Sequence, residues 1–226
     1  MTNAKKLLYI SDLDGTLLDE EGRLPADSIK RLNKLIDKGL NFTIATARNY
    51  DSAYPLLKGL NLKHPVILFN GVYLTEFHTG TNLLFSDFIS VDIINKMISI
   101  ADGHNIEPFI YTYGDKHLVY FRRINNLGAQ AYLDIISSEQ RAHKVDSFSF
   151  PISEHISGFL LIDTQEALEP VNAKLKSLYE NELNIYFAPD VSNPEFCWLQ
   201  SFHQEANKGK MLTHMVEHLS IPISNT

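Results

Sequence analysis

Two aspartates that follow a short apolar run near the start of the chain constrain its fold more than any other feature. Residues 7–10 predict a buried strand, Asp12 and Asp14 come directly behind it, and Gly15 lets the chain turn away. Carboxylates so close together repel each other, and a bound cation would offset their charge. One could then attack a phosphorus atom while the other handles protons. The alternative is a polar turn with both acids solvated, but the buried strand and the partners downstream favour the first interpretation.

The N-terminal part of the chain is predicted to alternate strands and helices. A helix over residues 28–38 places its apolar side chains on one face, and a strand over 42–45 follows it. A second helix at 52–57 leads to a third strand at 66–69. This order favours right-handed crossovers and therefore an α/β fold with a doubly wound parallel sheet.

Polar residues, and in one case a glycine, follow each of these three strands. In a parallel sheet of this kind, ligands bind outside the carboxyl ends of the strands, so these residues should converge. They are Asp12, Asp14, Thr46, Arg48, Asn70 and Gly71.

The pattern changes after the third strand. Residues 72–74 and 83–85 flank a turn and predict a hairpin. Beyond it, mixed helices and strands indicate a second α+β unit with a mainly antiparallel sheet. Its expected helices cover 91–101, 125–137 and 165–181, and its expected strands cover 108–113, 117–122, 156–162 and 184–187. We expect a strand at 196–200 to return to the first domain and a helix over 208–219 to follow.

The composition narrows the class of protein. The chain has 226 residues, of which 44% are hydrophobic and 21% charged, as in a soluble globular protein with a substantial core. A net charge of −7 argues against nucleic-acid binding. No apolar run approaches the ~18 residues that span a bilayer, and the N-terminal apolar stretch is too short for a secretory signal. The single cysteine, Cys197, excludes an internal disulfide, so we expect a cytoplasmic protein without a membrane partner.

Four motifs together resemble the haloacid dehalogenase superfamily. They are Asp-Leu-Asp-Gly-Thr at 12–16, Thr46 within Ala-Thr-Ala-Arg, Asn70-Gly71 after the third strand, and Lys208-Gly209 before an apolar helix. Their order and spacing are similar to those of Cof-type members, which carry a large inserted cap, and the resemblance extends over essentially the whole chain. It implies a core domain of residues 1–86 and 190–226 and an α+β cap domain of residues 87–189.

The resemblance also implies a role for each motif. Asp12 would be the nucleophile that forms an aspartyl-phosphate, and Asp14 would protonate the leaving oxygen and then activate water. Thr46 would donate its hydroxyl to a phosphoryl oxygen, although such a hydroxyl can instead cap the next helix. Lys208 would neutralise phosphoryl charge. A lysine that merely begins a helix would face the unfavourable positive end of the helix dipole.

Three further residues have two interpretations each. Asn70 and Gly71 would contact phosphate or substrate, or would only form the turn. Arg48 would reach the substrate or would be solvated. Aromatic and basic residues of the cap are weaker candidates, because each fits cap core or surface as well: Tyr111, Tyr113, Tyr120, Arg122 and Arg123.

Phosphoryl transfer of this kind implies a Mg²⁺ cofactor. The resemblance implies that the ion is held by the Asp12 side chain, the Asp14 backbone carbonyl and an acidic residue of a Gly-Asp-x-x-x-Asp-like motif. This sequence lacks that motif. The chain stops at Thr226, about where the strand before that motif would begin. We therefore expect a truncated version of a longer protein or a natural remnant with weakened catalysis. Losing that strand would leave Tyr9 and Ile10 on an open edge that could mediate homo-oligomer formation.

The expected function is a Mg²⁺-dependent phosphatase for a small phosphorylated metabolite, with a sugar phosphate as the favoured kind. Two rivals stay open. One is a non-catalytic binder of a phosphorylated ligand, which the missing acidic motif favours. The other is a phosphomutase-type transferase on the same scaffold, which would return the phosphoryl group to substrate rather than to water.

Overall fold

The chain passes between two structural units, after Ser86 and again after Gln204. The computed structural model describes residues 7–114, 116–190 and 192–226, so residues 1–6 and 191 of the expected core domain and residue 115 of the expected cap domain lie outside the described residues. One unit comprises residues 1–86 with 205–226, and the other comprises residues 87–204. The second crossing lies after residue 204, whereas the sequence led us to expect it after residue 189.

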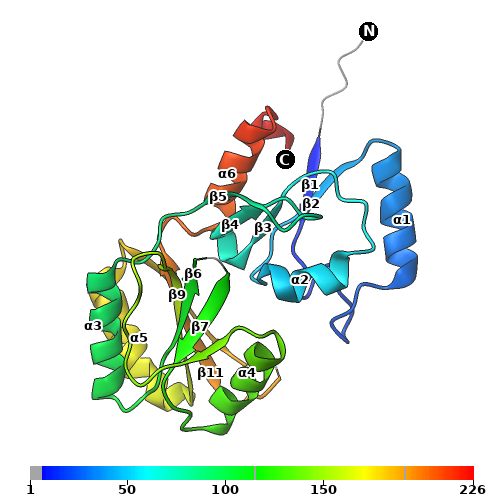
Figure 1. Ribbon diagram of the computed structural model, residues 1–226. Coiled ribbons are helices and arrows are strands. Elements are labelled where there is room, and N and C mark those ends of the chain that lie inside the picture. Colours follow the sequence, from blue (N-terminus) through cyan, green and yellow to red (C-terminus); the bar gives the residue numbers. More distant parts are fainter. Residues whose placement is uncertain (1–6, 115, 191) are drawn as a thin grey trace. The chain divides into compact units, whose positions relative to one another are not determined.

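The first unit contains the expected parallel strands (Figure 1). Strand β1 (Leu8–Ser11) pairs in parallel with β2 (Asn41–Ile44), and Ala45 forms a parallel bridge with Ile67 of the third strand. The elements between and after them are helix α1 (Ala26–Asp37), helix α2 (Tyr50–Leu57), strand β3 (Val66–Leu68) and the short 3-10 turn η1 (Phe69–Gly71). The α/β class and the parallel strand order are confirmed for this part of the chain.

An antiparallel hairpin extends from β3. Strands β4 (Tyr73–Thr75) and β5 (Asn82–Phe85) pair with each other, and β4 also pairs with β3. The hairpin expected between residues 72 and 85 is therefore confirmed.

Helix α6 (Lys208–His218) closes one apolar cluster of the first unit. Its buried Met211 and Met215 pack with Leu8 of β1 and Ile67 of β3. The helix also contacts η1, so its first turn lies beside the chain that leaves β3. A 3-10 turn, η2 (Ile223–Asn225), follows it.

The second unit is built on a six-stranded sheet with the order β10-β11-β9-β6-β7-β8. All its strand pairs are antiparallel except β7 with β8. Its strands are β6 (Phe109–Tyr113), β7 (His117–Phe121), β8 (Ala142–Lys144), β9 (His155–Asp163), β10 (Leu183–Pro189) and β11 (Cys197–His203). Its helices are α3 (Val91–Gly103), α4 (Leu127–Ser138) and α5 (Gln165–Tyr179). An α+β unit was expected here, and its main elements are present.

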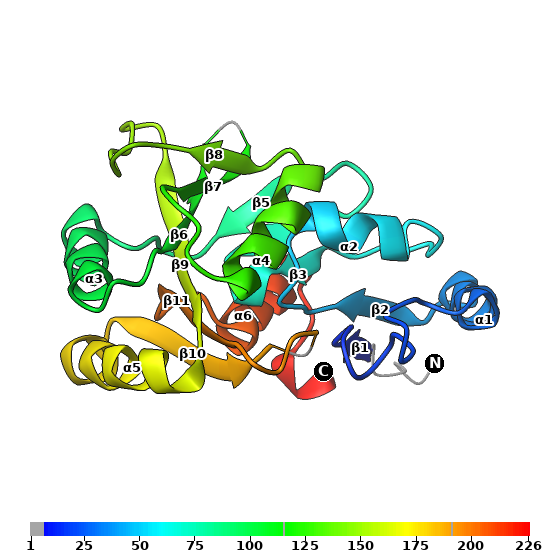
Figure 2. The same cartoon turned by 90° about the horizontal axis from the view of Figure 1, so that it is seen from below.

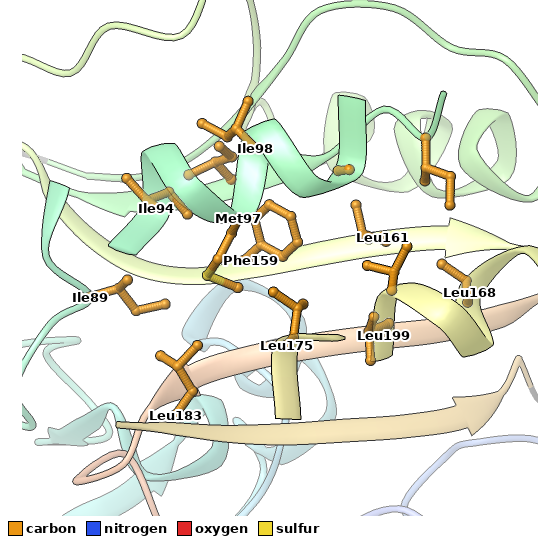
Figure 3. Packing of buried hydrophobic residues seen from close by; sticks show 14 of the residues in the cluster. Ile89, Ile94, Met97, Ile98, Phe159, Leu161, Leu168, Leu175, Leu183 and Leu199 are labelled. Carbon is orange, nitrogen blue, oxygen red and sulfur yellow. The ribbon is translucent and has the colours of Figure 1, made fainter. Parts of the chain in front are cut away.

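Helices cover both faces of this sheet. Figure 2 shows α3 and α5 on one side and α4 on the other. On the first side, Met97 of α3 and Leu175 of α5 meet Phe159 of β9 in a fully buried cluster (Figure 3). On the other side, the Tyr132 ring of α4 makes edge contacts with Phe109 of β6. These two layers form the cores of the second unit.

The expectation that residues 196–200 return to the first domain is wrong. Strand β11 lies between β10 and β9 of the second unit and pairs antiparallel with both. The physical reason is local, because a short connection with a turn at Asp190 brings β11 back along β10. Strand β8 was not expected from the sequence, since three residues show too little alternation to predict a strand.

None of the helices in the described part of the chain is long and apolar enough to cross a membrane.

Candidate active site

The Asp12 carboxylate, which follows β1, holds the centre of the candidate site. One of its oxygens, Oδ1, accepts a hydrogen bond from the backbone N–H of Leu13 at 2.8 Å. The other, Oδ2, lies 2.7 Å from the Nζ atom of Lys208. Since 43% of the Asp12 side chain and 33% of the Lys208 side chain stay exposed, a ligand can reach both groups.

A tight turn after Asp12 anchors the loop that carries Asp14. The Leu13 side chain is fully buried, and its carbonyl accepts hydrogen bonds from the backbone N–H groups of Thr16, Leu17 and Leu18. Gly15 takes a φ of +69°, which strongly favours glycine. The turn leaves the Asp14 side chain 54% exposed.

Arg48 engages Asp14 with both arms of its guanidinium. Its Nε atom donates to Oδ2 of Asp14 at 2.9 Å, and its Nη2 atom donates to Oδ1 at 2.7 Å. Such a two-point contact is the strongest geometry for an arginine and a carboxylate. Arg48 thus binds the carboxylate that the family resemblance links to proton transfer, an arrangement that the sequence analysis did not anticipate.

Thr46 is buried where the chain leaves β2. Its side-chain oxygen accepts a hydrogen bond from the backbone N–H of Arg48 at 3.2 Å, in the loop before α2. The helix-cap alternative for Thr46 is wrong, because the side chain of Asn49 caps α2 by accepting the N–H of Ser52. An accepting hydroxyl still has its own proton to donate. The Thr46 carbonyl accepts the N–H of Asn70 at 3.1 Å, which ties the ends of β2 and β3 together.

Close contact with Gly71 positions the start of α6, where Lys208 lies. The residue has a φ of +93°, and a β-carbon built on it would lie 2.4 Å from the carbonyl carbon of Asn207 and 2.8 Å from the backbone nitrogen of Lys208. Only glycine allows so close a backbone approach. Asn207 caps the helix, because its Oδ1 accepts the N–H of Gly209 at 2.8 Å. For Gly71 the geometry supports the turn interpretation, while substrate contact by Asn70 stays a prediction.

The structure therefore brings the predicted residues of the first unit to one end of its parallel strands. Asp12 contacts Lys208, Asp14 contacts Arg48, and Thr46 is linked through the backbone to Arg48 and to Asn70. The close contact of Gly71 with the first turn of α6 joins the remaining element.

A Mg²⁺ ion would find only part of a binding set in the described residues. They contain no group of three histidine, cysteine, aspartate or glutamate side chains that could hold a metal ion. Asp12 offers a partly exposed carboxylate, and the Asp14 carbonyl is a second oxygen donor. Mg²⁺ keeps several waters and often takes its remaining ligands from substrate phosphate. The residues therefore fit a Mg²⁺ ion that binds together with a phosphate group rather than before it.

The weaker candidates in the second unit have structural partners. Tyr111 and Tyr120 are buried in the sheet. Arg122 pairs with Asp102 and Glu107, and Arg123 also pairs with Glu107. These contacts agree with the core and surface interpretations of these residues.

Comparison with known proteins establishes the family. The fold and the site define an α/β protein with two aspartates behind its first parallel strand and a lysine from a later helix against the first of them. A family model described as haloacid dehalogenase-like hydrolase matches residues 9–226, and the chain belongs to this family.

Curated relatives with sequence similarity are phosphatases. The 5-amino-6-(5-phospho-D-ribitylamino)uracil phosphatase YitU of Bacillus subtilis is 24% identical over 123 residues, which cover 51% of this chain and 46% of the relative. The pyridoxal phosphate phosphatase YbhA of Escherichia coli is 33% identical over 109 residues, which cover 48% of this chain and 39% of the relative. The matched part of the chain thus spans less than half the length of these two relatives.

Solved structures share the fold. A haloacid dehalogenase-like hydrolase from Bacteroides thetaiotaomicron superposes with a TM-score of 0.73 at 16% identity, covering 95% of this chain and 77% of that one. A second such hydrolase, from B. subtilis, has a TM-score of 0.71 at 17% identity, with coverage of 95% and 79%. At this level of identity the likeness concerns the fold alone.

Proposed function

We propose that this chain provides the phosphoryl-transfer site of a phosphatase that hydrolyses a small phosphorylated metabolite. The observation that carries the proposal is the 2.7 Å contact between the exposed Asp12 carboxylate and the Lys208 ammonium at the end of β1. A carboxylate is a competent nucleophile toward phosphorus, and a fixed cation beside it offsets the charge of an incoming phosphoryl group.

The proposed chemistry proceeds in two balanced steps. An Asp12 oxygen forms a bond to phosphorus while the bond to the leaving oxygen breaks, and that oxygen takes a proton from Asp14. Asp14 then removes a proton from water, which attacks the aspartyl-phosphate, releases inorganic phosphate and restores Asp12. Lys208 and the Thr46 hydroxyl would stabilise the phosphoryl oxygens. Because Arg48 occupies both oxygens of Asp14, this pair must open before Asp14 can carry a proton.

Mg²⁺ is the proposed cofactor, held by the Asp12 carboxylate and the Asp14 carbonyl. When bound, it would neutralise charge on the phosphoryl oxygens. The described residues contain no group of three metal-ligating side chains, so we expect weak Mg²⁺ binding without phosphate and modest turnover by this chain.

The substrate class is proposed as a small phosphomonoester. A sugar phosphate is the favoured kind, and the names of the relatives point to 5-amino-6-(5-phospho-D-ribitylamino)uracil and pyridoxal phosphate. A substrate panel should therefore include all three kinds.

Release of inorganic phosphate from this panel, with Mg²⁺ and with a chelator, tests the proposal. Asp12→Asn should abolish turnover, because an amide does not attack phosphorus. Asp14→Asn should slow turnover by roughly 10²–10⁴-fold, because only the proton donor and base is lost. Equal residual activity in the two variants would show that the nucleophile is misassigned.

A non-catalytic binder of phosphorylated ligands is the second candidate. The observation in its favour is that the described residues lack a three-ligand acidic metal group. Binding of a panel member in calorimetry, with no phosphate release under any condition, would support this candidate over the phosphatase. Transfer of the phosphoryl group to a second position of the substrate would instead indicate a phosphomutase.

A further inference from the structure

The second unit contains a cavity of about 550 Å³ that shares no residue with the candidate active site. It is lined by residues of α4, the end of β10 and β11. Tyr132 and Ile135 come from α4, Asp190 follows β10, and Trp198 and Gln200 come from β11. The volume falls in the range of pockets that bind small molecules.

An aromatic wall with a fixed orientation lines one side of this cavity. The Trp198 and Tyr132 rings meet edge to face, with centroids 5.2 Å apart. The indole Nε1–H of Trp198 donates to Oδ2 of Asp190 at 3.1 Å. The other oxygen of Asp190 accepts the backbone N–H groups of Ser192 and Asn193, so the carboxylate itself is anchored. The contact with Tyr132 and the N–H hydrogen bond together fix the orientation of the Trp198 ring, which preorganises it for stacking.

Neutral polar groups support the base of the cavity. Gln200 donates its amide N–H to the hydroxyl of Tyr111 at 3.3 Å, and the Tyr132 hydroxyl also donates to that oxygen at 3.1 Å. Burial raises the pKa of both tyrosines, so they stay uncharged. The hydrogen bond from Gln200 fixes its amide and leaves the carbonyl oxygen as an acceptor.

The charge of the lining selects against phosphate. Among the described residues that line the cavity, Asp190 is the one charged side chain, and none is lysine, arginine or histidine. An anionic group would meet the like charge of Asp190 and no basic side chain in the lining, whereas a ligand N–H would find acceptors in the Asp190 carboxylate and the Gln200 carbonyl. An aromatic wall, hydrogen-bond acceptors and no basic side chain in the lining suit an uncharged aromatic ligand that donates hydrogen bonds.

We propose that this cavity binds an uncharged heteroaromatic ring that carries N–H donors, such as a pyrimidine base. The ring stacks on Trp198, and its N–H groups donate to Asp190 and Gln200. This site extends beyond the proposed phosphatase activity, because it uses neither Asp12 nor Lys208.

Tryptophan fluorescence tests the proposal directly, because Trp198 is the only tryptophan of the chain. The full chain is titrated with uracil and, as the matched probe, with 1,3-dimethyluracil, which has the same ring without N–H donors. Uracil should quench the fluorescence saturably, 1,3-dimethyluracil should bind at least about 10-fold more weakly, and inorganic phosphate should have no effect. Equal quenching by the two rings, or none by uracil, would overturn the proposal.

Two helix variants locate the bound ring. Ala131 lines the cavity from α4, so Ala131→Leu should fill it and remove the uracil response. Ala173→Leu makes the same change at an exposed position of α5 outside the cavity and should behave as the unaltered chain. An unchanged uracil response in Ala131→Leu would place the ring elsewhere and contradict the proposal.

A third variant, Asp190→Asn, tests the proposed hydrogen bond with almost no change in side-chain shape. Thermal unfolding checks that all three variants are folded. Asp190→Asn should weaken uracil binding several-fold while 1,3-dimethyluracil stays unaffected; an equal change for both probes would contradict the proposed hydrogen bond. The assay does not depend on phosphate release. An inactive protein that still binds uracil would therefore remove the proposed function and leave this inference intact.

Discussion

At the scale of single residues, Lys208 shows how a residue in a locally unfavourable position can indicate a functional site. A positive charge in the first turn of a helix opposes the helix dipole, at a cost of about 0.3–1 kcal/mol. The Lys208 ammonium lies against the Asp12 carboxylate, which offsets that cost by supplying a counter-charge. The residue thus gains its partner from a strand that lies almost the whole chain away.

Gly71 positions Lys208, and its replacement should damage activity more than stability. In Gly71→Ala the new β-carbon must displace the backbone of Asn207 and Lys208. A shift of about 1 Å in a charged group costs about 100-fold in rate, so we expect kcat/KM for phosphate release to fall by about that factor. Both kcat/KM and thermal unfolding should be measured.

The matched control is Gly39→Ala. Gly39 has a similar φ of +100° but nothing within 4 Å of an added β-carbon, so it carries the backbone strain without the displacement. The strain alone should cost Gly39→Ala about 1–2 kcal/mol of stability, and the variant should keep its activity. In a Lys208→Ala background, Gly71→Ala should add no further loss of rate. A full additional loss there would show that Gly71 does not act through Lys208.

Sequence patterns revealed the polar residues of this site but not all of their contacts. Asp12 and Thr46 follow from strand ends, which are local signals, and Lys208 follows from the order of motifs in the family resemblance. The Arg48–Asp14 pair depends on how the turn at Gly15 rotates the Asp14 side chain toward the loop after β2. No pattern along the chain encodes that rotation.

At the scale of elements, β11 is a strand whose existence, but not whose sheet, could be predicted from the sequence pattern. Its apolar residues predict a strand, but the same pattern fits the sheet of either unit. The seven residue pairs with β10 and the five with β9 settle its place in the second unit. By contrast, hairpins and helices with clear caps, such as α3 after Ser90 and α5 after Thr164, could be predicted because their signals are local.

His117, at the start of β7, should make the second unit sensitive to acid. Burial lowers the pKa of this histidine from 6.5 to about 3, and the positive charge of Arg141, whose Nη1 lies 3.3 Å from the His117 Nδ1, adds to the effect. Between these two pKa values the unfolded chain binds a proton that the folded chain does not. Stability from this residue is therefore fully present above pH 6.5 and is lost as the pH falls toward 3.

Urea unfolding followed by Trp198 fluorescence measures this loss. Lowering the pH from 6.5 to about 5 should remove up to about 2 kcal/mol through His117 alone. His117→Gln should show a pH dependence that is smaller by that amount, whereas His143→Gln, at an exposed position of β8, should match the unaltered chain. Identical pH dependence in all three proteins would rule out His117 as the source.

At the scale of the whole molecule, the open edge of the parallel strands has a physical consequence. Among the described strands, β1 pairs with β2 alone, and its Tyr9 side chain is 51% exposed. An uncovered, partly apolar strand edge favours pairing with another chain. The solved structures that share the fold contain additional length, since the chain covers 77% and 79% of the two described above.

We therefore predict that the 226-residue chain associates through β1. Sedimentation velocity should show a concentration-dependent rise in mass. Tyr9→Lys should suppress it, because a charge on an edge strand opposes pairing. Leu35→Lys, at an exposed apolar position of α1, is the control and should leave association unchanged. A monomer at every concentration would show that β1 does not mediate association.

The central claim is that Asp12 carries the phosphoryl group, and chemical trapping tests it most directly. The Asp14→Asn variant is mixed with 4-nitrophenyl phosphate and Mg²⁺, stopped with acid and treated with borohydride, which reduces an aspartyl-phosphate to homoserine. Trypsin then releases the peptide of residues 7–23 for sequencing by mass spectrometry. The account predicts homoserine at position 12. Homoserine at another position, or an unmodified peptide from a preparation that hydrolyses the substrate, would contradict it.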